Sequence, residues 1–244
     1  MPARVVLGVD IGTSSSKGVL VGPERKTLRS ATRARSVVRP FPGHVETCVY
    51  LWWQEFVETS TELTSPADVD VVAVGASGMG PCVLVTDGHA RPPRPAILYG
   101  VDTRETAQIG EPNTALDSAE VLERCGSALS SQAVGPKLAW LWENEPEVLA
   151  RARRILMPSS SLAFELTGAF VLDHHSASQC TQMFDAGALS WYRPWVDLIA
   201  PGIELPPLLW RGEQFGVTFR PVAGIAAGVP VITGPIDARS EALR

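Results

Sequence analysis

Short runs of apolar residues separated by polar turns open the chain and predict strands. Apolar runs at residues 5–9 and 19–21 flank a turn rich in glycine, serine and threonine, which predicts two antiparallel strands. A weak alternation over residues 27–38 predicts a third antiparallel strand. The near-continuous apolar run at residues 69–76 predicts a strand of an α/β sheet that is covered on both faces.

Apolar residues recur at helical spacing over residues 48–63, with the charged residues mostly on the other face. This pattern predicts a helix that packs onto the sheet through its Trp52-Trp53 pair, which we prefer to a role in stacking against a sugar. Pro146 fits the first turn of a helix and would break a continuous one, so it divides the next helical stretch in two. Other helices are expected at 118–125, at 162–166 after three serines that can cap it, and at 191–200. Short strands are expected at 82–86, 96–99, 155–157, 169–172 and 229–233.

The composition indicates a globular protein with a sizeable core. The chain has 244 residues, of which 45% are hydrophobic and 19% charged, enough for one large domain or two small ones. The net charge of −5 argues against a nucleic-acid partner, and the arginines between residues 25 and 39 are interpreted as a solvated face. No apolar run is long enough to span a bilayer, so we expect no membrane partner.

The cysteines and histidines do not have the spacing of a metal site. The cysteines at 48, 82, 125 and 180 form no CxxC pair and are expected to be reduced, mostly buried thiols. The N-terminus has no signal-peptide pattern, and both observations indicate a cytoplasmic protein. His174 and His175 are adjacent, and on a strand they would point to opposite faces, so they cannot easily share one ion.

The turn between the first two strands has the residues of a phosphate-binding hairpin. Gly12 leaves room for a phosphate to approach the backbone, and the neighbouring hydroxyls and N–H groups can bind its oxygens. Asp10 ends the first strand beside this turn, where its carboxylate could hold a divalent cation. The alternative is a plain surface hairpin, but the order of strand, Asp, Gly-Thr-Ser, Lys, Gly and strand favours the phosphate site.

Three further segments place polar or small residues at the ends of predicted strands. Gly78 and Met79 follow the strand at 69–76, where open α/β sheets bind their ligands. Asp102 and Arg104 can each hydrogen-bond a polyhydroxylated ligand, and the alternative is an N-cap with a surface ion pair. Asp237 follows the last strand as Asp10 follows the first, although its position alone fits an N-cap equally well.

Taken in order, these segments resemble the FGGY carbohydrate kinases, and most of all the xylulokinases among them. The resemblance covers essentially the whole chain. The blocks that carry it are VDIGTSSSKGVL, PGHVET followed by WW, the strand ending GASGMG, RPAILYGVDTRE, PKLAWLWENEPE, LTGAFVLDHHSAS and VITGPIDARSEAL. The resemblance implies an α/β, actin-like or ribonuclease H-like ATPase fold with a mixed five-stranded sheet and flanking helices. It also implies that residues 1–244 are the N-terminal, sugar-binding and catalytic lobe of a two-lobed kinase, without the C-terminal nucleotide-binding lobe.

The resemblance also implies the roles of single residues in transfer of the ATP γ-phosphoryl group to a sugar hydroxyl. Asp237 matches the general base, and Asp10 matches the position that binds Mg²⁺ through water. Gly78, Met79, Asp102 and Arg104 match loops that line the sugar pocket. The residues matching the part of the ATP site that faces the phosphates are Asp10, Gly12, Thr13 and Ser14, with Lys17 beside them in the same block.

This sequence departs from the xylulokinase pattern at three places. Met79-Gly80 stands where xylulokinases have Met-His, and YGVDTR replaces the shorter WNDGR type. Pro235 precedes Ile236-Asp237 where xylulokinases are glycine-rich. The expected acceptor is therefore a ketopentose such as xylulose or a related polyol, rather than xylulose alone.

Two other functions compete with that of a kinase lobe. The chain could be a non-catalytic, sugar-binding remnant or regulatory protein that lacks its ATP lobe. It could also be an actin-like or heat-shock-type ATPase that shares only the hairpin, although the PGHVET and YGVDTR blocks argue against this. As a kinase, the chain alone is expected to be inactive until a C-terminal lobe or a homodimer partner completes the site.

Overall fold

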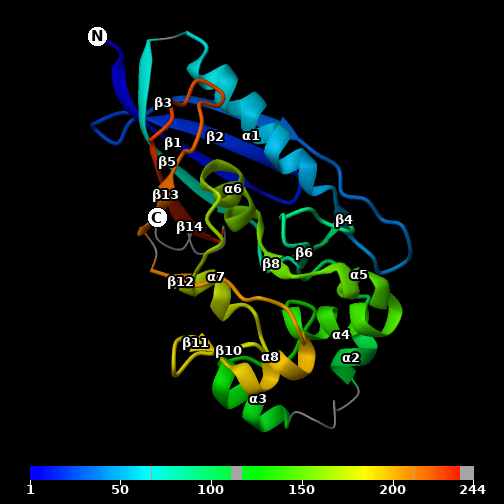
Figure 1. Ribbon diagram of the computed structural model, residues 1–244. Helices are drawn as coiled ribbons and strands as arrows, with labels where there is room; N and C mark the ends of the chain where they lie inside the picture. The colour runs from blue at the N-terminus through cyan, green and yellow to red at the C-terminus, as the bar shows by residue number, and fades with distance from the viewer. Residues whose placement is uncertain (67, 111–116, 211, 237–244) are drawn as a thin grey trace.

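A six-stranded mixed sheet forms one end of the molecule in the computed structural model (Figure 1). The structure describes residues 1–66, 68–110, 117–210 and 212–236. Strands β1 (Ala3–Ile11), β2 (Ser15–Val21) and β3 (Thr27–Ala34) are antiparallel neighbours, as the apolar runs predict. Strands β5 (Val69–Gly78) and β14 (Pro230–Ile236) run parallel to β1, and β13 (Gln214–Val217) forms the far edge.

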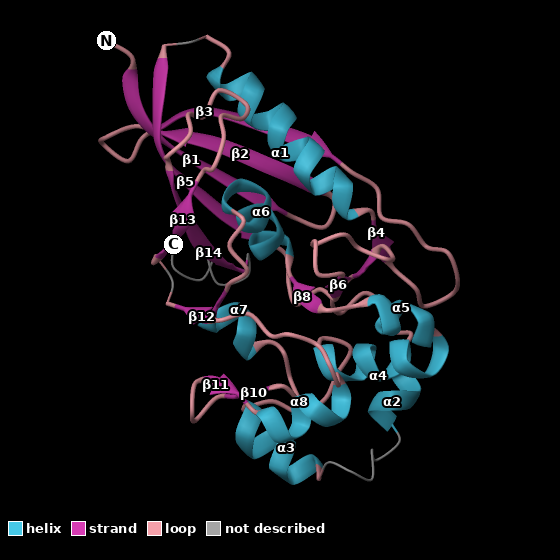
Figure 2. Ribbon diagram, viewed as in Figure 1, coloured by secondary structure: helices cyan, strands magenta, loops and turns pink. Residues whose placement is uncertain are grey.

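Helices α1 (Val49–Thr64) and α6 (Pro158–Thr167) cover one face of this sheet (Figure 2). Alternate residues of β1, from Val5 to Ile11, are buried against them, together with Trp52 and Phe56 of α1. The register pairs Val9 with Gly18 and Ala76, so these residues share the helix-covered face. Asp10 pairs with Lys17 and Ser77 and lies on the opposite face.

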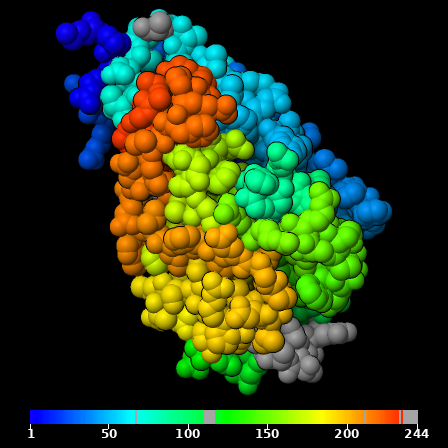
Figure 3. Space-filling view, in the orientation of Figure 1, coloured from blue at the N-terminus to red at the C-terminus, as the bar shows by residue number. Residues whose placement is uncertain are grey.

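A second hydrophobic core lies at the other end of the molecule, among helices and short strand pairs. In the space-filling view, the C-terminal part of the chain, coloured orange, lies beside the yellow-green α6 region (Figure 3). The helices of this part are α2 (Thr106–Gly110), α3 (Ser118–Cys125), α4 (Val134–Asn144), α5 (Pro146–Arg151), α7 (His174–Ser178) and α8 (Arg193–Ile199). The short strands pair as β4 (Glu46–Thr47) with β7 (Ala96–Ile97), β6 (Leu84–Thr86) with β8 (Arg154–Leu156), β9 (Leu172–Asp173) with β12 (Leu208–Leu209), and β10 (Phe184–Asp185) with β11 (Ser190–Trp191).

The structure corrects four expectations. The main sheet has six strands instead of five, because β13 adds to the edge of β14. Helix α6 begins at Pro158, so the three serines lie inside its first turns, and the Ser160 hydroxyl accepts the Met157 N–H at 2.8 Å. His174 and His175 begin helix α7 instead of lying on a strand. The arginines between 25 and 39 do not all form a solvated face, because the side chain of Arg35 is only 1% exposed.

Candidate functional site

The turn between β1 and β2 is tight, and its backbone leaves N–H groups available for a ligand. The Gly12 N–H donates to the Ser15 carbonyl at 2.9 Å, and a Cβ at Gly12 would lie only 3.0 Å from that oxygen. In the described part of the chain, no oxygen accepts a hydrogen bond from the N–H of Thr13 or of Ser14. A glycine at the start and two N–H groups at the tip suit the approach of an anion.

Asp10 and Ser77 end two neighbouring parallel strands beside this turn. The Ser77 hydroxyl donates to Asp10 Oδ1 at 2.7 Å, which orients the carboxylate. Lys17, on β2, is the cross-strand partner of Asp10 and its side chain is exposed. The structure thus brings together the five residues expected at the phosphates. It also adds Ser77, which is the cross-strand partner of Asp10 on β5.

Gly78 and Met79 continue β5 beneath the turn. The Met79 N–H donates to the Ile11 carbonyl at 2.7 Å, and the Met79 side chain is buried in the core. A Cβ at Gly78 would lie 2.8 Å from Cβ of Pro158, at the start of α6. Close packing between β5 and α6 therefore requires the glycine, and Met79 contributes its side chain to the core below the site.

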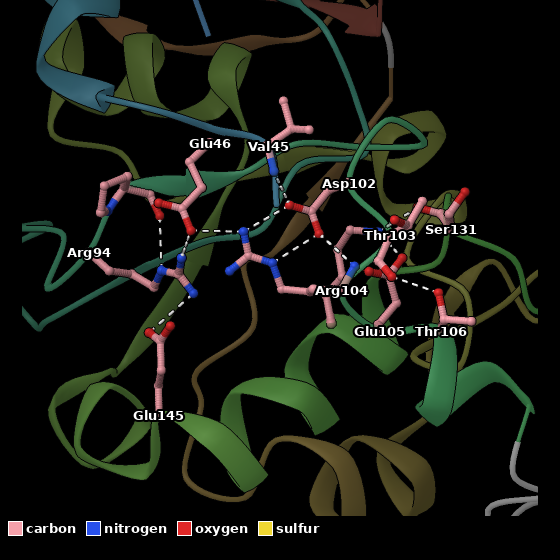
Figure 4. A network of polar contacts seen from close by, with 12 residues as sticks. Val45, Glu46, Arg94, Asp102, Thr103, Arg104, Glu105, Thr106, Ser131 and Glu145 are labelled. Atoms are coloured by element: carbon pink, nitrogen blue, oxygen red, sulfur yellow. Dashed lines mark hydrogen bonds and ion pairs between the residues drawn. The ribbon is translucent and has the colours of Figure 1, made fainter. Parts of the chain in front are cut away.

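Asp102 and Arg104 lie in a buried network of charges, so the expected alternative of a surface ion pair is wrong (Figure 4). Arg104 donates from Nε to Asp102 Oδ1 at 2.9 Å and from Nη2 to Asp102 Oδ2 at 2.8 Å. Nη2 also donates to Glu46 Oε1 at 2.8 Å, and Glu46 in turn accepts from Arg94. Both side chains of the Asp102–Arg104 pair are 0% exposed.

Hydrogen bonds keep the Asp102 carboxylate ionised despite its burial. Burial alone would raise the pKa of Asp102, but donation from Arg104 and from the Val45 N–H, which lies 2.5 Å from Oδ2, lowers the pKa below its ordinary value. The guanidinium of Arg104 also lies 4.9 Å from the ring centre of Trp140. In the described residues, Nη1 of Arg104 has no hydrogen-bond partner, so one donor remains for another group.

Tyr99 joins the hairpin to the segment that carries Asp102. Its hydroxyl lies 3.2 Å from Oγ1 of Thr13 at the tip of the hairpin. The contact spans 86 residues of sequence, and no local pattern of the residues indicates it. The hairpin and the Asp102 segment therefore lie next to each other.

Residues 5–243 match the family model described as "FGGY family of carbohydrate kinases, N-terminal domain". The chain belongs to this family. The xylulose kinase of Escherichia coli (strain K12) is 27% identical over 243 residues, which cover 95% of this chain and 48% of that protein. The glycerol kinase of Nocardia farcinica is 28% identical over 236 residues, which cover 93% of this chain and 47% of that protein.

Solved structures of sugar and glycerol kinases agree with the fold. The xylulose kinase from Rhodospirillum rubrum superposes with a TM-score of 0.92 at 27% identity, covering 98% of this chain and 50% of that one. The glycerol kinase of Plasmodium falciparum, solved with ADP, gives a TM-score of 0.90 at 20% identity, which supports the fold alone. The chain spans about half the length of the FGGY relatives it matches.

The FGGY hairpin and the last strand meet at one edge of the sheet. Ile236 of β14 pairs with Gly78 of β5, which pairs with Ile11 of β1. Asp237, the predicted general base, lies outside the described residues. Within the described ranges, no cluster of three or more His, Cys, Asp or Glu side chains could hold a metal ion, and no helix is long and apolar enough to cross a membrane.

Proposed function

We propose that this chain is the N-terminal lobe of an ATP-dependent sugar kinase, and that its acceptor is a ketopentose such as xylulose or a related polyol. The observation that carries the proposal is the hairpin at the edge of the sheet where β1, β5 and β14 end. Family membership supports a carbohydrate kinase, and several relatives are named xylulose kinases.

The phosphate end of the nucleotide fits the hairpin. We assign the N–H groups of Thr13 and Ser14 to the β- and γ-phosphates, with Gly12 allowing close approach and Lys17 adding a positive charge nearby. A carboxylate held by Ser77 suits a hydrated Mg²⁺, which we assign to Asp10. When bound, Mg·ATP supplies the phosphoryl group, and these residues orient it and stabilise its charge.

The acceptor sugar is assigned to the neighbouring segment. Arg104 keeps one donor, Nη1, for a ligand oxygen, while Asp102 holds the guanidinium in place. Gly78 and Met79 shape the floor beneath the acceptor. Asp237 would accept the proton of the attacking hydroxyl, a role that contributes on the order of 100- to 10,000-fold to the rate.

The four free cysteines suit a reducing compartment, and we assign the protein to the cytoplasm.

The test supplies a second lobe. The chain is fused after Arg244 to the C-terminal half of the E. coli xylulose kinase, and ADP formation is measured over a panel of ketopentoses, hexuloses and polyols. We expect sugar-dependent turnover that falls at least about 100-fold in Asp237→Asn. Asp197→Asn, on the exposed surface of α8, is the matched control and keeps full turnover. Full activity in Asp237→Asn would remove the assigned role of the base.

The second candidate is a sugar-binding protein without catalysis, which rests on the buried Asp102–Arg104 pair alone. Calorimetry on the 244-residue chain separates the two functions. Sugar binding by the chain, with no ADP formed by the folded fusion, supports this second function. Sugar-independent ATP hydrolysis would contradict both.

A further inference from the structure

Another buried ion pair lies directly beneath the hairpin, between β3, β2 and helix α1. Arg35 follows β3 and donates from Nη1 to Oε2 of Glu55 on α1, and the Ser16 hydroxyl donates to the same oxygen. The side chains of Arg35 and Glu55 are 1% and 9% exposed, and Ser16 is fully buried. This cluster, which we call the Arg35–Glu55 pair, differs from the other arginine pairs of β3, because those lie at the surface.

The same arginine binds the turn. Arg35 Nη2 donates to the Gly12 carbonyl, and the backbone N–H of Arg35 donates to the Ser14 carbonyl at 2.8 Å. The Ser15 carbonyl accepts from Gly12. Three carbonyls of the turn are thus bound within the protein. A carbonyl aimed at a phosphate would repel it, so this arrangement leaves N–H groups to face the ligand.

We infer that Arg35 and Glu55 are positioning residues that hold the hairpin in its phosphate-binding conformation from below. This inference rests on the proposed function, because it gives the pair a role only if the hairpin binds phosphate. Both terminal nitrogens of Arg35 donate within the protein, Nη1 to Glu55 and Nη2 to the Gly12 carbonyl, and Glu55 balances the charge. Arg35 therefore contributes to the geometry of the backbone from Gly12 to Ser14, and not to direct attraction of the anion.

The stability of a buried ion pair does not explain its presence. Replacing both members with apolar residues of similar size often leaves a protein as stable or makes it more stable, whereas removing one member alone is strongly destabilising. Burial lowers the pKa of Arg35, which shows that desolvation opposes its charge even with Glu55 present. A pair that adds little to stability and binds the Gly12 carbonyl is suited to fixing one conformation of the turn.

The test follows backbone amides of the 244-residue chain by NMR, with magnesium and inorganic tripolyphosphate as the probe. In the wild type, we expect the Gly12, Thr13 and Ser14 amides to shift on titration. The double variant Arg35→Met with Glu55→Leu should unfold at nearly the wild-type temperature, bind the probe about tenfold more weakly, and exchange the Gly12 amide faster. Loss of one hydrogen bond to the turn corresponds to about that factor.

Two further variants separate geometry from charge and from folding. Arg35→Lys keeps the charge and the pair with Glu55, but one ammonium cannot span Glu55 and Gly12 as the guanidinium does, so the same weakening of probe binding is expected in a chain that remains folded. If the double variant does not fold, Arg35→Lys decides the question. Arg33→Met with Glu62→Leu changes an exposed pair between the same strand and helix, and it should bind the probe as the wild type does.

The outcomes distinguish the inference from the proposed function. Wild-type affinity and unchanged Gly12 exchange in both Arg35 variants would overturn the positioning role and leave the phosphate site standing. A wild-type chain whose hairpin amides do not respond to the probe would overturn the phosphate site itself. In that case the Gly12 exchange rate still shows whether Arg35 holds the turn.

Discussion

The sheet end and the helical end of this molecule position their polar residues in different ways. At the sheet end, strand register places Asp10 beside Ser77 and Lys17, and each residue lies within a regular strand, one or two positions from its end. The candidate sugar segment, which carries Asp102 and Arg104, leads into the helical end. It is held by buried ion pairs between distant parts of the chain, such as Arg104 with Glu46 of the short strand β4, 58 residues apart. Regular backbone fixes the first set, and buried charge fixes the second.

The variant with the largest expected effect on stability removes Arg104, the central cation of the Asp102 network. Arg104→Met leaves the Asp102 carboxylate buried without its guanidinium, and the free energy of unfolding should fall by about 3–5 kcal/mol. Urea denaturation followed by circular dichroism measures it. Arg193→Met, whose partner Asp197 is exposed, should cost less than about 1 kcal/mol. Equal losses of unfolding free energy in the two variants would show that water screens the charges of the network and that the ion pairs do not hold the segment.

A smaller effect tests packing at the sheet end. A Cβ at Gly18 would lie 2.3 Å from Thr59 and 3.0 Å from Leu63 of α1, so Gly18→Ala should cost about 1–3 kcal/mol. A Cβ at Gly75, on the opposite face, meets no described atom within 4 Å. Gly75→Ala should be neutral or slightly stabilising, since alanine restricts the unfolded chain. Equal losses in thermal unfolding would mean that the second face is covered as tightly as the first.

The two ends also differ in how much the sequence predicts. Alternation and the Gly-Thr-Ser turn predict β1, β2 and the grouping of Asp10 with the hairpin, and helical spacing predicts α1 with Trp52 in the core. Arg33 and Arg35 are two residues apart on similar sequence, yet only Arg35 is buried. The difference depends on which glutamate of α1 faces each arginine, which requires the packed helix.

The same limit applies to the candidate sugar segment. The sequence suggests that Asp102 and Arg104 are polar residues at the start of a helix, but their burial depends on Glu46 and on the Val45 N–H, far away along the chain. Tyr99 and Thr13 meet for the same reason. Contacts of this kind depend on tertiary packing, and neither hydrophobic periodicity nor residue spacing indicates them.

The acid limb of the stability curve provides a further test of the network. The folded-state pKa of Asp102 lies below its ordinary value of 3.8, so the carboxylate stabilises the fold above that pH, and the contribution is lost as pH falls through the folded-state pKa. Asp102→Asn should be less stable at pH 7, and its stability should fall less steeply below about pH 4. Urea denaturation at each pH measures both, with Asp197→Asn, at an exposed position of α8, as the matched substitution. Parallel curves for Asp102→Asn and the wild type would contradict the assignment.

The smallest effect concerns the rates at which the cysteines react, which report how often each core opens. Cys82 belongs to the sheet core, and Cys125 and Cys180 belong to the helical core. Burial raises the pKa of Cys82 to about 12, so its thiolate is scarce at pH 8. Only the partly exposed Cys48 should react quickly with iodoacetamide, measured by mass spectrometry with Cys48→Ser as the control.

The alkylation rates of the buried cysteines then allow a direct comparison of the two ends, because alkylation at a buried site requires local opening. If regular strands hold the sheet core and loop contacts hold the helical core, Cys125 and Cys180 should react faster than Cys82 once the higher thiol pKa of Cys180 is allowed for. Cys82 lies close enough to Arg35 for that charge to lower its pKa slightly against the effect of burial. Arg35→Lys should leave Cys82 slow, since it keeps the charge and the fold. Faster alkylation of Cys82 than of Cys125 and Cys180 in the wild type would mean that the sheet core opens more readily than the helical core.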